Sequence, residues 1–359
     1  MDGHAALSLL RQLVEIESPT GSPGVLDVAE LMAAELRARG GRAEVLEAGH
    51  VVAELRGTGA PVALVGHSDT VWPEGTLATM PFVSEGGVAR GPGVYDMKAG
   101  LVVMLAAIDA AGADRRPLRV FLTADEEQGS RSAREPLRDV VEGVAAAFVV
   151  EPPTADGHLK TSRKGLGRFR IAIEGRPAHA GTNLADGVSA VEELAHQIIS
   201  LHSLTDHERG ISVNVGTISG GTRENVVAAA AEANLDVRVA EVADVEAVEA
   251  VLRGLTPTLD GTRITVSGAW TRPPLEPTPA SRMLFARARE HAHDLGFDVS
   301  EASSGGGSDA NLIGALGVPV LDGLGAEGGG AHAYDEHVRL DSLPLRSRLL
   351  ARLLEDPGL

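Results

Sequence analysis

Potential metal ligands stand directly after three short apolar segments in the first half of the sequence. The segments and the residues that follow them are Val62–Val65 with Gly66-His67-Ser68-Asp69, Leu118–Thr123 with Ala124-Asp125-Glu126-Glu127, and Ala146–Val150 with Glu151. Imidazole nitrogens and carboxylate oxygens are donors that Zn²⁺ accepts in proteins. The chain has no cysteine, so any such metal must bind to His, Asp and Glu side chains.

His67 and Asp69 are separated by one residue. Side chains at positions i and i+2 of an extended segment point to the same side, so the imidazole and the carboxylate can face one site. A carboxylate placed in this way can fix the orientation and the tautomer of a ligating histidine. An isolated His-x-Asp sequence is also typical of an ordinary loop histidine, and the pair taken alone leaves this interpretation open.

Asp96 and the Glu126-Glu127 pair also have two interpretations each. Asp96 lies in the glycine-rich segment Gly91–Gly100 before a predicted helix, where it is typical of a helix N-cap as well as of a ligand. Adjacent glutamates are common on acidic surfaces, but at a metal site one can bind the ion while its neighbour takes a proton from water. His332, which follows a glycine run near the C-terminus, completes the set of candidates.

The elements expected to position these residues form an α/β domain. Apolar periodicity predicts helices over residues 4–16 and 24–39, before the first of the three apolar segments expected as buried strands, and over residues 97–111, between the first and the second. In such sheets ligands gather at the carboxyl ends of the strands. The candidate residues stand at those ends, so the sequence predicts that they meet at one edge of the sheet.

The pattern changes at about residue 162 and predicts a second, inserted domain. Strands are expected at 167–174, 211–218, 228–240 and 262–270, and helices at 185–202 and 243–255. The order βαββαβ is that of ferredoxin-like α+β domains. A proline-rich segment, 272–277, leads back to the first domain. We therefore expect one catalytic α/β domain formed by residues 1–161 and 273–359, interrupted by a domain at 162–272.

Taken together, these features resemble a family of dinuclear zinc peptidases. The family includes glutamate carboxypeptidase, acetylornithine deacetylase, succinyl-diaminopimelate desuccinylase and aminoacylase, and the similarity is closest to the glutamate carboxypeptidase branch. It covers essentially the whole chain, and its motifs are Gly66–Val71, Gly91–Gly100, Thr123–Ser130, Gly175–Gly181 and Ala331–Val338.

The resemblance implies a role for each candidate residue of the first domain. Asp96 would bridge two zinc ions, for which Co²⁺ or Mn²⁺ could substitute. The remaining ligands would be His67 and Glu151 for one ion, and Glu127 and His332 for the other. Asp69 would support His67, and Glu126 would act as the general base.

The resemblance also assigns the inserted domain as a lid through which two subunits form a homodimer. His179 matches a histidine that reaches the partner's site and stabilises the oxyanion. Asn225, Arg238 and Arg272 match positions that bind the substrate. An arginine suits a planar carboxylate. The implied substrate is a small peptide or an N-acyl amino acid with a free carboxylate, and the implied activity is that of a carboxypeptidase or, alternatively, an N-acyl-amino-acid deacylase.

Two other sequence matches point to different classes of protein. Gly66-His67-Ser68-Asp69-Thr70 resembles the nucleophile elbow of a serine α/β-hydrolase, with Ser68 as nucleophile, but Thr70 replaces the second glycine. Gly323–Gly328 fits the dinucleotide-binding pattern G-x-G-x-x-G, but it lies near the C-terminus rather than after a first strand. A metal-bound scaffold without activity is disfavoured by the intact base at Glu126.

Charge and hydropathy exclude two kinds of partner. The formal net charge of -18 would repel nucleic acid and anionic lipid. No apolar stretch of about 18 residues is present to span a membrane. The N-terminus, Met1-Asp2-Gly3-His4, lacks the basic and apolar regions of a signal peptide, so we expect a cytoplasmic protein.

Overall fold

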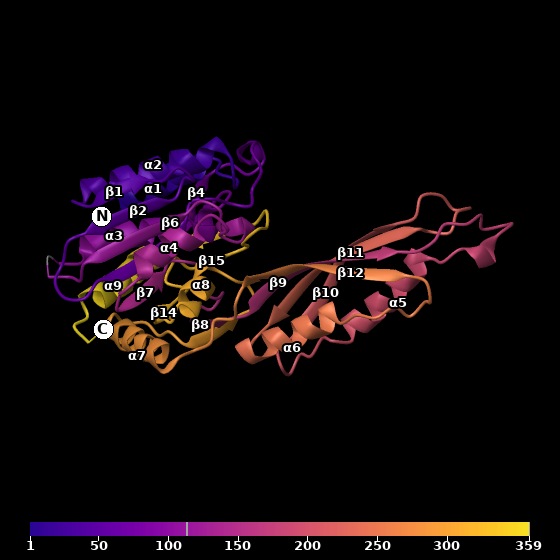
Figure 1. Ribbon diagram of the computed structural model, residues 1–359. Coiled ribbons are helices and arrows are strands. Elements are labelled where there is room, and N and C mark those ends of the chain that lie inside the picture. Colours follow the sequence, from indigo (N-terminus) through magenta and orange to yellow (C-terminus); the bar gives the residue numbers. More distant parts are fainter. Residues whose placement is uncertain (113, 359) are drawn as a thin grey trace. The chain divides into compact units, whose positions relative to one another are not determined.

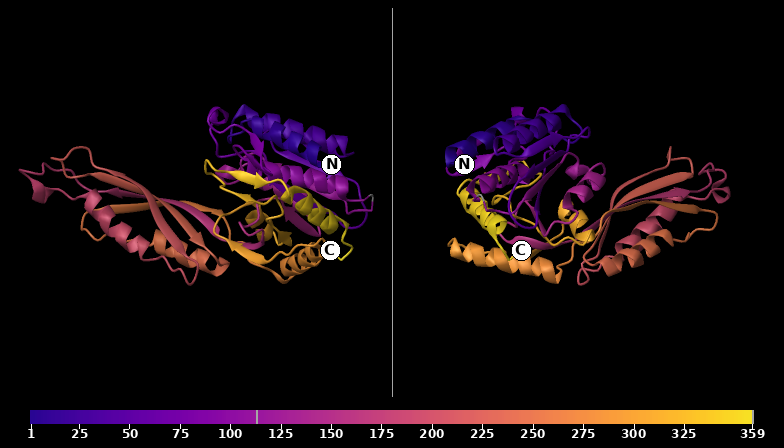
Figure 2. Two further views of the ribbon diagram at one scale, coloured as in Figure 1. Left: turned by 180° about the vertical axis from the view of Figure 1, so that it is seen from behind. Right: turned by 60° about the vertical axis from the view of Figure 1, so that its left-hand side comes forward.

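The computed structural model describes residues 1–112 and 114–358, which divide into two compact units (Figures 1 and 2). The first unit contains the N-terminal segment as far as Ser162, Pro277–Ser304 and the C-terminal segment from Ser308. The second contains Arg163–Glu276 and the glycines Gly305–Gly307. Both chain ends lie on the first unit. The grouping of these three glycines with the inserted unit was not predicted.

The first unit is built on a six-stranded, mostly parallel sheet. Its strands, in spatial order, are β1 (Arg42–Val45), β2 (Val51–Leu55), β6 (Leu118–Thr123), β3 (Val62–His67), β7 (Ala146–Val149) and β14 (Val320–Leu321). Strands β6, β3, β7 and β14 are parallel, whereas β2 pairs antiparallel with β6 and β1. The β1–β2 hairpin was not predicted. It adds an antiparallel edge to the expected sheet.

Helices cover the sheet because its central strands are apolar at successive positions. All six residues of β3 are buried, as expected for a strand that is covered on both faces. The helices of this unit are α1 (Gly3–Glu15), α2 (Pro23–Ala38), α3 (Ala99–Ala110), α4 (Arg134–Val141), α7 (Pro279–Asp294), α8 (Asp309–Ala315) and α9 (Ser342–Glu355). Helix α3 approaches the sheet closely at Gly100, where a Cβ would stand 2.1 Å from the carbonyl oxygen of Val150.

Short strands outside the main sheet join segments that are distant in sequence. A small antiparallel sheet has the order β15 (Gly328–Gly329), β16 (His337–Arg339), β5 (Val88–Arg90) and β4 (Val83–Glu85). Strand β8 (Leu159–Arg163) pairs with β13 (Glu301–Ser304). Because β16 pairs with β5, the segment after His332 lies beside the loop that contains Asp96. This pairing was not predicted from the sequence.

The second unit has the predicted βαββαβ order. Its elements are β9 (Gly165–Glu174), α5 (Ala190–His202), β10 (Ser212–Gly220), β11 (Ala230–Val239), α6 (Val242–Arg253) and β12 (Arg263–Arg272). All neighbouring strands are antiparallel, in the order β10-β11-β9-β12. Alternate strand residues, such as Phe169, Ile171 and Leu235, pack with the helices in a separate core. The expected fold class, α/β with an inserted ferredoxin-like unit, is confirmed.

Among the described residues, no helix has both the length and the apolar character needed to cross a bilayer.

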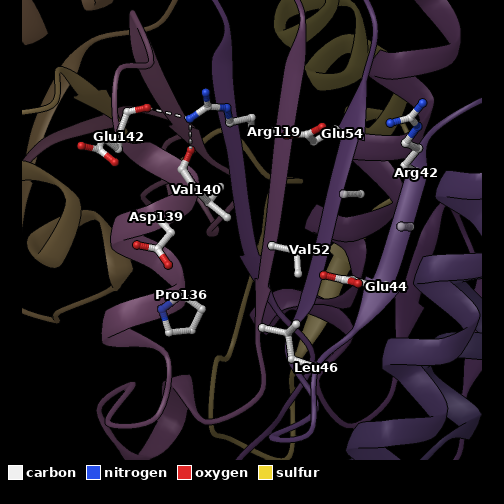
Figure 3. A pocket seen from close by; sticks show the side chains of 12 residues that line it. Arg42, Glu44, Leu46, Val52, Glu54, Arg119, Pro136, Asp139, Val140 and Glu142 are labelled. Atoms are coloured by element: carbon white, nitrogen blue, oxygen red, sulfur yellow. Dashed lines mark hydrogen bonds between the residues drawn. The ribbon is translucent and has the colours of Figure 1, made fainter.

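A groove of about 830 Å³ lies on β1, β2 and β6 beside α4 (Figure 3). Charged side chains, including Arg42, Glu54, Arg119 and Asp139, line this groove together with Val52. The candidate metal ligands are not among its lining residues, so the groove is separate from the candidate site.

Candidate metal centre

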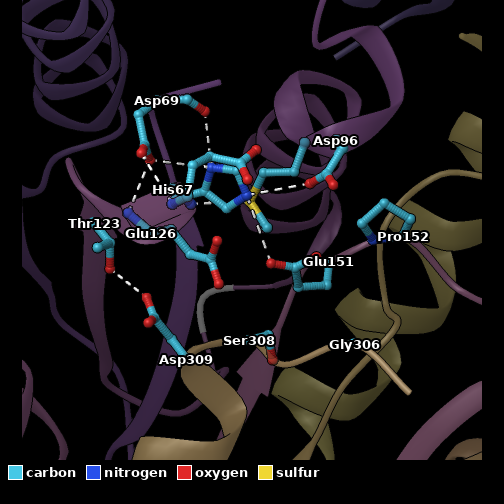
Figure 4. Close-up of polar contacts among 12 residues, drawn as sticks. His67, Asp69, Asp96, Thr123, Glu126, Glu151, Pro152, Gly306, Ser308 and Asp309 are labelled. Carbon is cyan, nitrogen blue, oxygen red and sulfur yellow. Dashed lines mark hydrogen bonds and ion pairs between the residues drawn. The ribbon is translucent and has the colours of Figure 1, made fainter. Parts of the chain in front are cut away.

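Five side chains form two groups of three potential metal ligands that share Asp96. The first group is His67, Asp96 and Glu151 (Figure 4), and the second is Asp96, Glu127 and His332. Within each group the potential ligand atoms lie within 4.8 Å of one another. These are the two sets that the resemblance implied.

The two oxygens of Asp96 face different histidines. Oδ1 lies 3.2 Å from Nε2 of His67, and Oδ2 lies 3.3 Å from Nε2 of His332. Nε2 of His67 is also 3.6 Å from Oε1 of Glu151, and Nε2 of His332 is 3.5 Å from Oε2 of Glu127. A carboxylate with one oxygen directed at each group is placed to bridge two cations.

Three of these potential ligands lie at or shortly after the ends of strands. His67 is the last residue of β3, Glu127 lies in the turn η3 (Glu126–Gln128) after β6, and Glu151 follows β7. These three strands are adjacent and parallel, so their carboxyl ends lie together. The prediction that strand ends would assemble the site is therefore consistent with the observed geometry.

Asp96 and His332 lie in segments of irregular backbone. Asp96 lies in the turn η2 (Val94–Lys98), which precedes α3, and its peptide bond to Met97 is cis. The expected N-cap role of Asp96 is wrong, because α3 begins after Lys98 and no side chain caps it. His332 lies between β15 and β16 with a φ of 62°, a conformation that is uncommon for a residue other than glycine.

The ligands perturb one another's protonation. Burial lowers the pKa of His67, but its hydrogen-bonded neighbours Asp69 and Asp96 outweigh burial and raise that pKa well above its ordinary value. Hydrogen bonds to Asp96 and Glu127 raise the pKa of His332 to about 10. Burial raises the pKa of Asp96, but the two histidines outweigh it and the net pKa is lowered. These raised pKa values favour protonated histidines in the metal-free protein at neutral pH.

The donor set fits divalent metal ions. Each group offers one imidazole nitrogen and two carboxylates, a combination that suits Zn²⁺ as well as Co²⁺ and Mn²⁺. Oε1 of Glu127 is buried and has no hydrogen-bond partner among the described residues. A buried carboxylate oxygen without a partner is costly, and a cation would satisfy it.

Asp69 is buried beside His67, and its carboxylate makes its closest hydrogen bonds to other residues. Nδ1 of His67 is 2.9 Å from the main-chain oxygen of Asp69 and 3.4 Å from its carboxylate. The carboxylate accepts hydrogen bonds from the hydroxyl of Thr20 and from the backbone N–H groups of Glu126 and Glu127. Asp69 thus orients His67 mainly through its backbone and holds the turn of the two glutamates through its side chain.

Glu126 belongs to neither ligand group. Its side chain projects from η3 toward the region of the Glu151 carboxylate (Figure 4). Its neighbour Glu127 is a member of the second group. Of the two adjacent glutamates, only Glu127 therefore belongs to a group of potential ligands.

The other sequence candidates lie in the second unit. His179 is exposed, and its Nδ1 accepts hydrogen bonds from the N–H groups of Gly181 and Thr182. Asn225 is exposed and follows the end of β10 in a loop whose Val226 pairs with His179. Arg238 is half-buried, binds Asp236 and donates to the main-chain oxygen of Gly305. Arg272 ends β12 and is buried.

The two competing motifs do not have the surroundings that they require. Ser68 is buried, and its hydroxyl donates to the main-chain oxygen of Thr123 at 3.2 Å. It is therefore not an exposed nucleophile. Gly323–Gly328 follows β14 and leads into β15 rather than opening a helix, so it does not form a dinucleotide-binding turn.

Buried polar residues around the centre were not predicted. Asp309 on α8 accepts hydrogen bonds from the hydroxyls of Thr123 and Ser130, which flank the Glu126-Glu127 turn. Glu336 is fully buried and accepts four N–H groups around Asp96. Glu336 lies four residues after His332, within a motif in which the sequence analysis considered only the histidine as a functional residue.

Comparison with known proteins identifies the chain. The family described as Peptidase family M20/M25/M40 matches residues 63–356. Carboxypeptidase G2 from Pseudomonas sp. (strain RS-16) is 29% identical over 371 residues, which cover 99% of this chain and 89% of that protein. Succinyl-diaminopimelate desuccinylase from Stenotrophomonas maltophilia (strain R551-3) is 28% identical over 98% of both chains.

Solved structures share the fold at lower sequence identity. A tripeptidase from Staphylococcus aureus superposes with a TM-score of 0.83 at 22% identity, over 99% of this chain and 98% of that one. An M20 family metallo-carboxypeptidase from Sulfolobus solfataricus has a TM-score of 0.78 at 17% identity, over 99% of both chains.

The fold and the paired ligand groups define a metal-dependent hydrolase that acts on amide bonds. More narrowly, the chain belongs to peptidase family M20/M25/M40.

Proposed function

We propose that this protein is a two-zinc hydrolase that cleaves an amide or peptide bond next to a free carboxylate, in the manner of a carboxypeptidase. One observation carries the proposal. Asp96 directs one oxygen at each of two ligand groups, and Glu126 precedes the ligand Glu127 without belonging to either group. This arrangement separates metal binding from proton transfer.

Bound zinc would polarise the scissile carbonyl and lower the pKa of the attacking water. The chain itself supplies the proton transfer. Glu126 takes the proton of the attacking water and returns it to the leaving amine when the carbon–nitrogen bond breaks. Asp69 fixes the backbone of Glu126 through the hydrogen bond from its N–H, so the base keeps its position during both transfers.

The inserted unit would supply the groups that recognise the substrate. Arg272, Asn225 and Arg238 are proposed to bind the free carboxylate and the carbonyl, because guanidinium and amide donors match these acceptors. His179 is proposed to stabilise the oxyanion in the active site of a partner subunit. His179 is exposed, and because its Nδ1 accepts hydrogen bonds, the neutral ring carries its N–H on Nε2, the donor that this role requires.

A symmetric homodimer through the inserted unit follows from the same proposal. Apolar side chains are exposed there, with Ile199 on α5 at 73%, Ile218 on β10 at 64% and Val191 on α5 at 44%. Residues of this kind are typical of the apolar core of a protein interface. We propose a cytoplasmic location for the dimer.

A second candidate function is the removal of an acyl group from an N-acyl amino acid. It uses the same ligands and the same base. The similarity to a succinyl-diaminopimelate desuccinylase over 98% of both chains supports it. In the first function the acyl part of the substrate is an aminoacyl or peptidyl group. In the second it is the acyl group of a carboxylic acid without an α-amino group.

A hydrolysis screen of the zinc-loaded enzyme tests both functions. The substrates are dipeptides and N-acyl amino acids, each paired with the same compound amidated at its carboxyl terminus. We expect hydrolysis of free carboxylates, little hydrolysis of the amides, and loss of activity in a strong chelator with recovery on adding zinc. Equal cleavage of the amidated compounds would contradict recognition of a carboxylate.

Two matched substitutions test the roles of the adjacent glutamates. Glu126→Gln should keep the metal content while kcat falls by about 10²–10⁴. Glu127→Gln should lose metal, because it removes a ligand. Metal loss in Glu126→Gln with retention in Glu127→Gln would reverse the two roles. Ser68→Ala serves as a control that should retain the activity.

A further inference from the structure

Glu336 is a buried acidic residue that the ligand groups do not include. It is 0% exposed, although burial of a carboxylate is costly unless the group is hydrogen-bonded. Each of its two oxygens accepts two N–H groups. Oε1 accepts from the backbone of Tyr95 at 2.9 Å and of Asp96 at 3.0 Å. Oε2 accepts from the indole of Trp72 at 2.7 Å and the backbone of Gly93 at 3.0 Å.

These four bonds join three segments that surround the metal centre. Trp72 follows the strand that ends in His67, Gly93–Asp96 is the loop that presents the shared ligand, and Glu336 follows His332. All four donors are N–H groups, which match the ionised carboxylate because it accepts hydrogen bonds only. The contacts therefore depend on both oxygens of a carboxylate.

Two consecutive backbone turns connect the loop of His332 to Glu336. The N–H of Glu336 donates to the main-chain oxygen of Ala333 at 2.9 Å, and the N–H of Ala333 donates to that of Gly330 at 2.9 Å. His332 lies within these turns at a positive φ and is half exposed. Its position consequently depends on the segment that Glu336 anchors.

We propose that Glu336 is a positioning residue that sets the distance between Asp96 and His332 and thereby the metal affinity of the Asp96–Glu127–His332 group. It belongs to neither group of potential ligands. It holds the backbone of one ligand and, through the following turns, the loop of another. The group of His67, Asp96 and Glu151 depends on Glu336 through Asp96 alone, because β3 and β7 position its other two members. This inference rests on the proposed metal centre.

The test measures metal affinity at each group separately. His67→Ala leaves the Asp96–Glu127–His332 group intact, and His332→Ala leaves the other group intact. Glu336→Gln is added to each background, and Co²⁺ affinity is measured by competition with a chromophoric chelator. We expect a roughly ten- to hundredfold loss in the His67→Ala background and a clearly smaller loss in the His332→Ala background, as for other residues that orient ligands.

The isosteric glutamine has a defined defect. Its amide group has one oxygen, so two of the four N–H donors face an NH₂ group instead of an acceptor. Glu336→Asp is the second variant, to be used if the Glu336→Gln protein fails to fold. It keeps the charge but is shorter by one methylene, so it cannot reach both pairs of donors. Melting temperature and circular dichroism confirm folding for each variant.

Two control variants separate positioning from general stabilisation. Glu327→Gln changes another acidic residue of the same segment, whose carboxylate binds Arg346 and Arg339 rather than the ligand loops. Trp72→Phe removes one donor to Glu336 and leaves its bonds to Tyr95 and Asp96. Both should keep the Co²⁺ affinity of each group within about threefold, even where the melting temperature falls.

The possible results separate this inference from the proposed function. Unchanged Co²⁺ affinity in a folded Glu336→Gln protein, in both backgrounds, would overturn the role of Glu336 while the metal centre stands. Equal losses in both backgrounds would overturn the selective effect on the group of His332. If the wild-type protein bound no Co²⁺, the metal centre itself would be refuted, and the inference with it.

Discussion

The substitution Asp69→Asn tests how the Glu126-Glu127 turn is held. It preserves the size of the side chain, removes its charge and converts one oxygen into an NH₂ donor. In the structure Oδ1 accepts the N–H of Glu126 at 3.1 Å. Oδ2 accepts the N–H of Glu127 at 3.1 Å and the hydroxyl of Thr20 at 2.7 Å.

The expected orientation of the asparagine follows from these partners. A hydroxyl can reverse its role and accept a hydrogen bond, whereas a backbone N–H cannot. The NH₂ group will therefore replace Oδ2, facing Thr20, and the N–H of Glu127 will lose its acceptor. The bond from Glu126 to the remaining oxygen is kept, so the ligand is affected more than the base.

The magnitude follows from the burial of this position. A buried N–H group that loses its acceptor costs about 1–3 kcal/mol. We expect the free energy of unfolding of the metal-free protein to fall by about this amount. Because the N–H that loses its acceptor belongs to Glu127, the position of this ligand should change as well. Metal affinity should then fall roughly ten- to hundredfold, with a corresponding loss of kcat/KM at limiting zinc.

Urea unfolding of the metal-free protein and zinc competition titrations measure the two effects. Saturating zinc should restore most of the kcat, because Glu126 keeps its hydrogen bond to residue 69. Thr20→Val is the matched control, since it removes only the hydroxyl and should leave zinc affinity nearly unchanged. If Asp69→Asn kept wild-type stability and zinc affinity, the carboxylate would not hold the turn as argued here.

Three further predictions concern protons, the C-terminus and the dimer. Because the pKa values of His67 and His332 are raised in the metal-free protein, metal must displace protons. Affinity should therefore rise with pH up to about 10, and calorimetry in buffers of different ionisation enthalpy should show proton release at pH 7. The pKa of Asp356 is lowered to about 2; burial raises it, but hydrogen bonds from Arg287 and other groups outweigh burial. A carboxylate with a lowered pKa stabilises the fold above its unfolded pKa, so Asp356→Asn should cost about 1–2 kcal/mol at pH 7 in urea unfolding. The difference should vanish as the pH falls from 4 through 2. Mixing inactive Glu126→Gln and His179→Ala subunits under exchange conditions should restore activity toward about a quarter of wild type; exchange without rescue would contradict a shared site.

Three of the candidate ligands could be predicted because they follow apolar strands. The runs before His67, Glu127 and Glu151 are short, buried and parallel, so a pattern of burial in the sequence is enough to bring their ends together. The βαββαβ order was equally visible, because its strands alternate and its helices have a 3.6-residue period. The bridging position of Asp96 was implied only by the family motif, since η2 is irregular and has no periodic pattern.

The residues that hold the ligands in place could not be predicted from patterns. The contact of Glu336 with the Asp96 loop depends on the pairing of β16 with β5, two strands of three residues each. Strands this short have no detectable alternation. Asp309 likewise reaches Thr123 and Ser130 only because α8 packs beside the main sheet, a long-range contact. Each of these acids resembles an ordinary surface carboxylate in the sequence.

The three buried acids share one physical function around the centre. Asp69 accepts the backbone of the Glu126-Glu127 turn, Asp309 accepts the hydroxyls on either side of it, and Glu336 accepts the backbone of the Asp96 loop. A buried charge is costly unless its lone pairs are satisfied, and here the donors come mainly from the loops that carry the ligands. If a loop moves, the buried carboxylate loses its hydrogen bonds and the folded state is destabilised. The bonds that stabilise these buried acids therefore also hold the ligand atoms in place before a metal binds. Metal binding then needs less rearrangement of the loops.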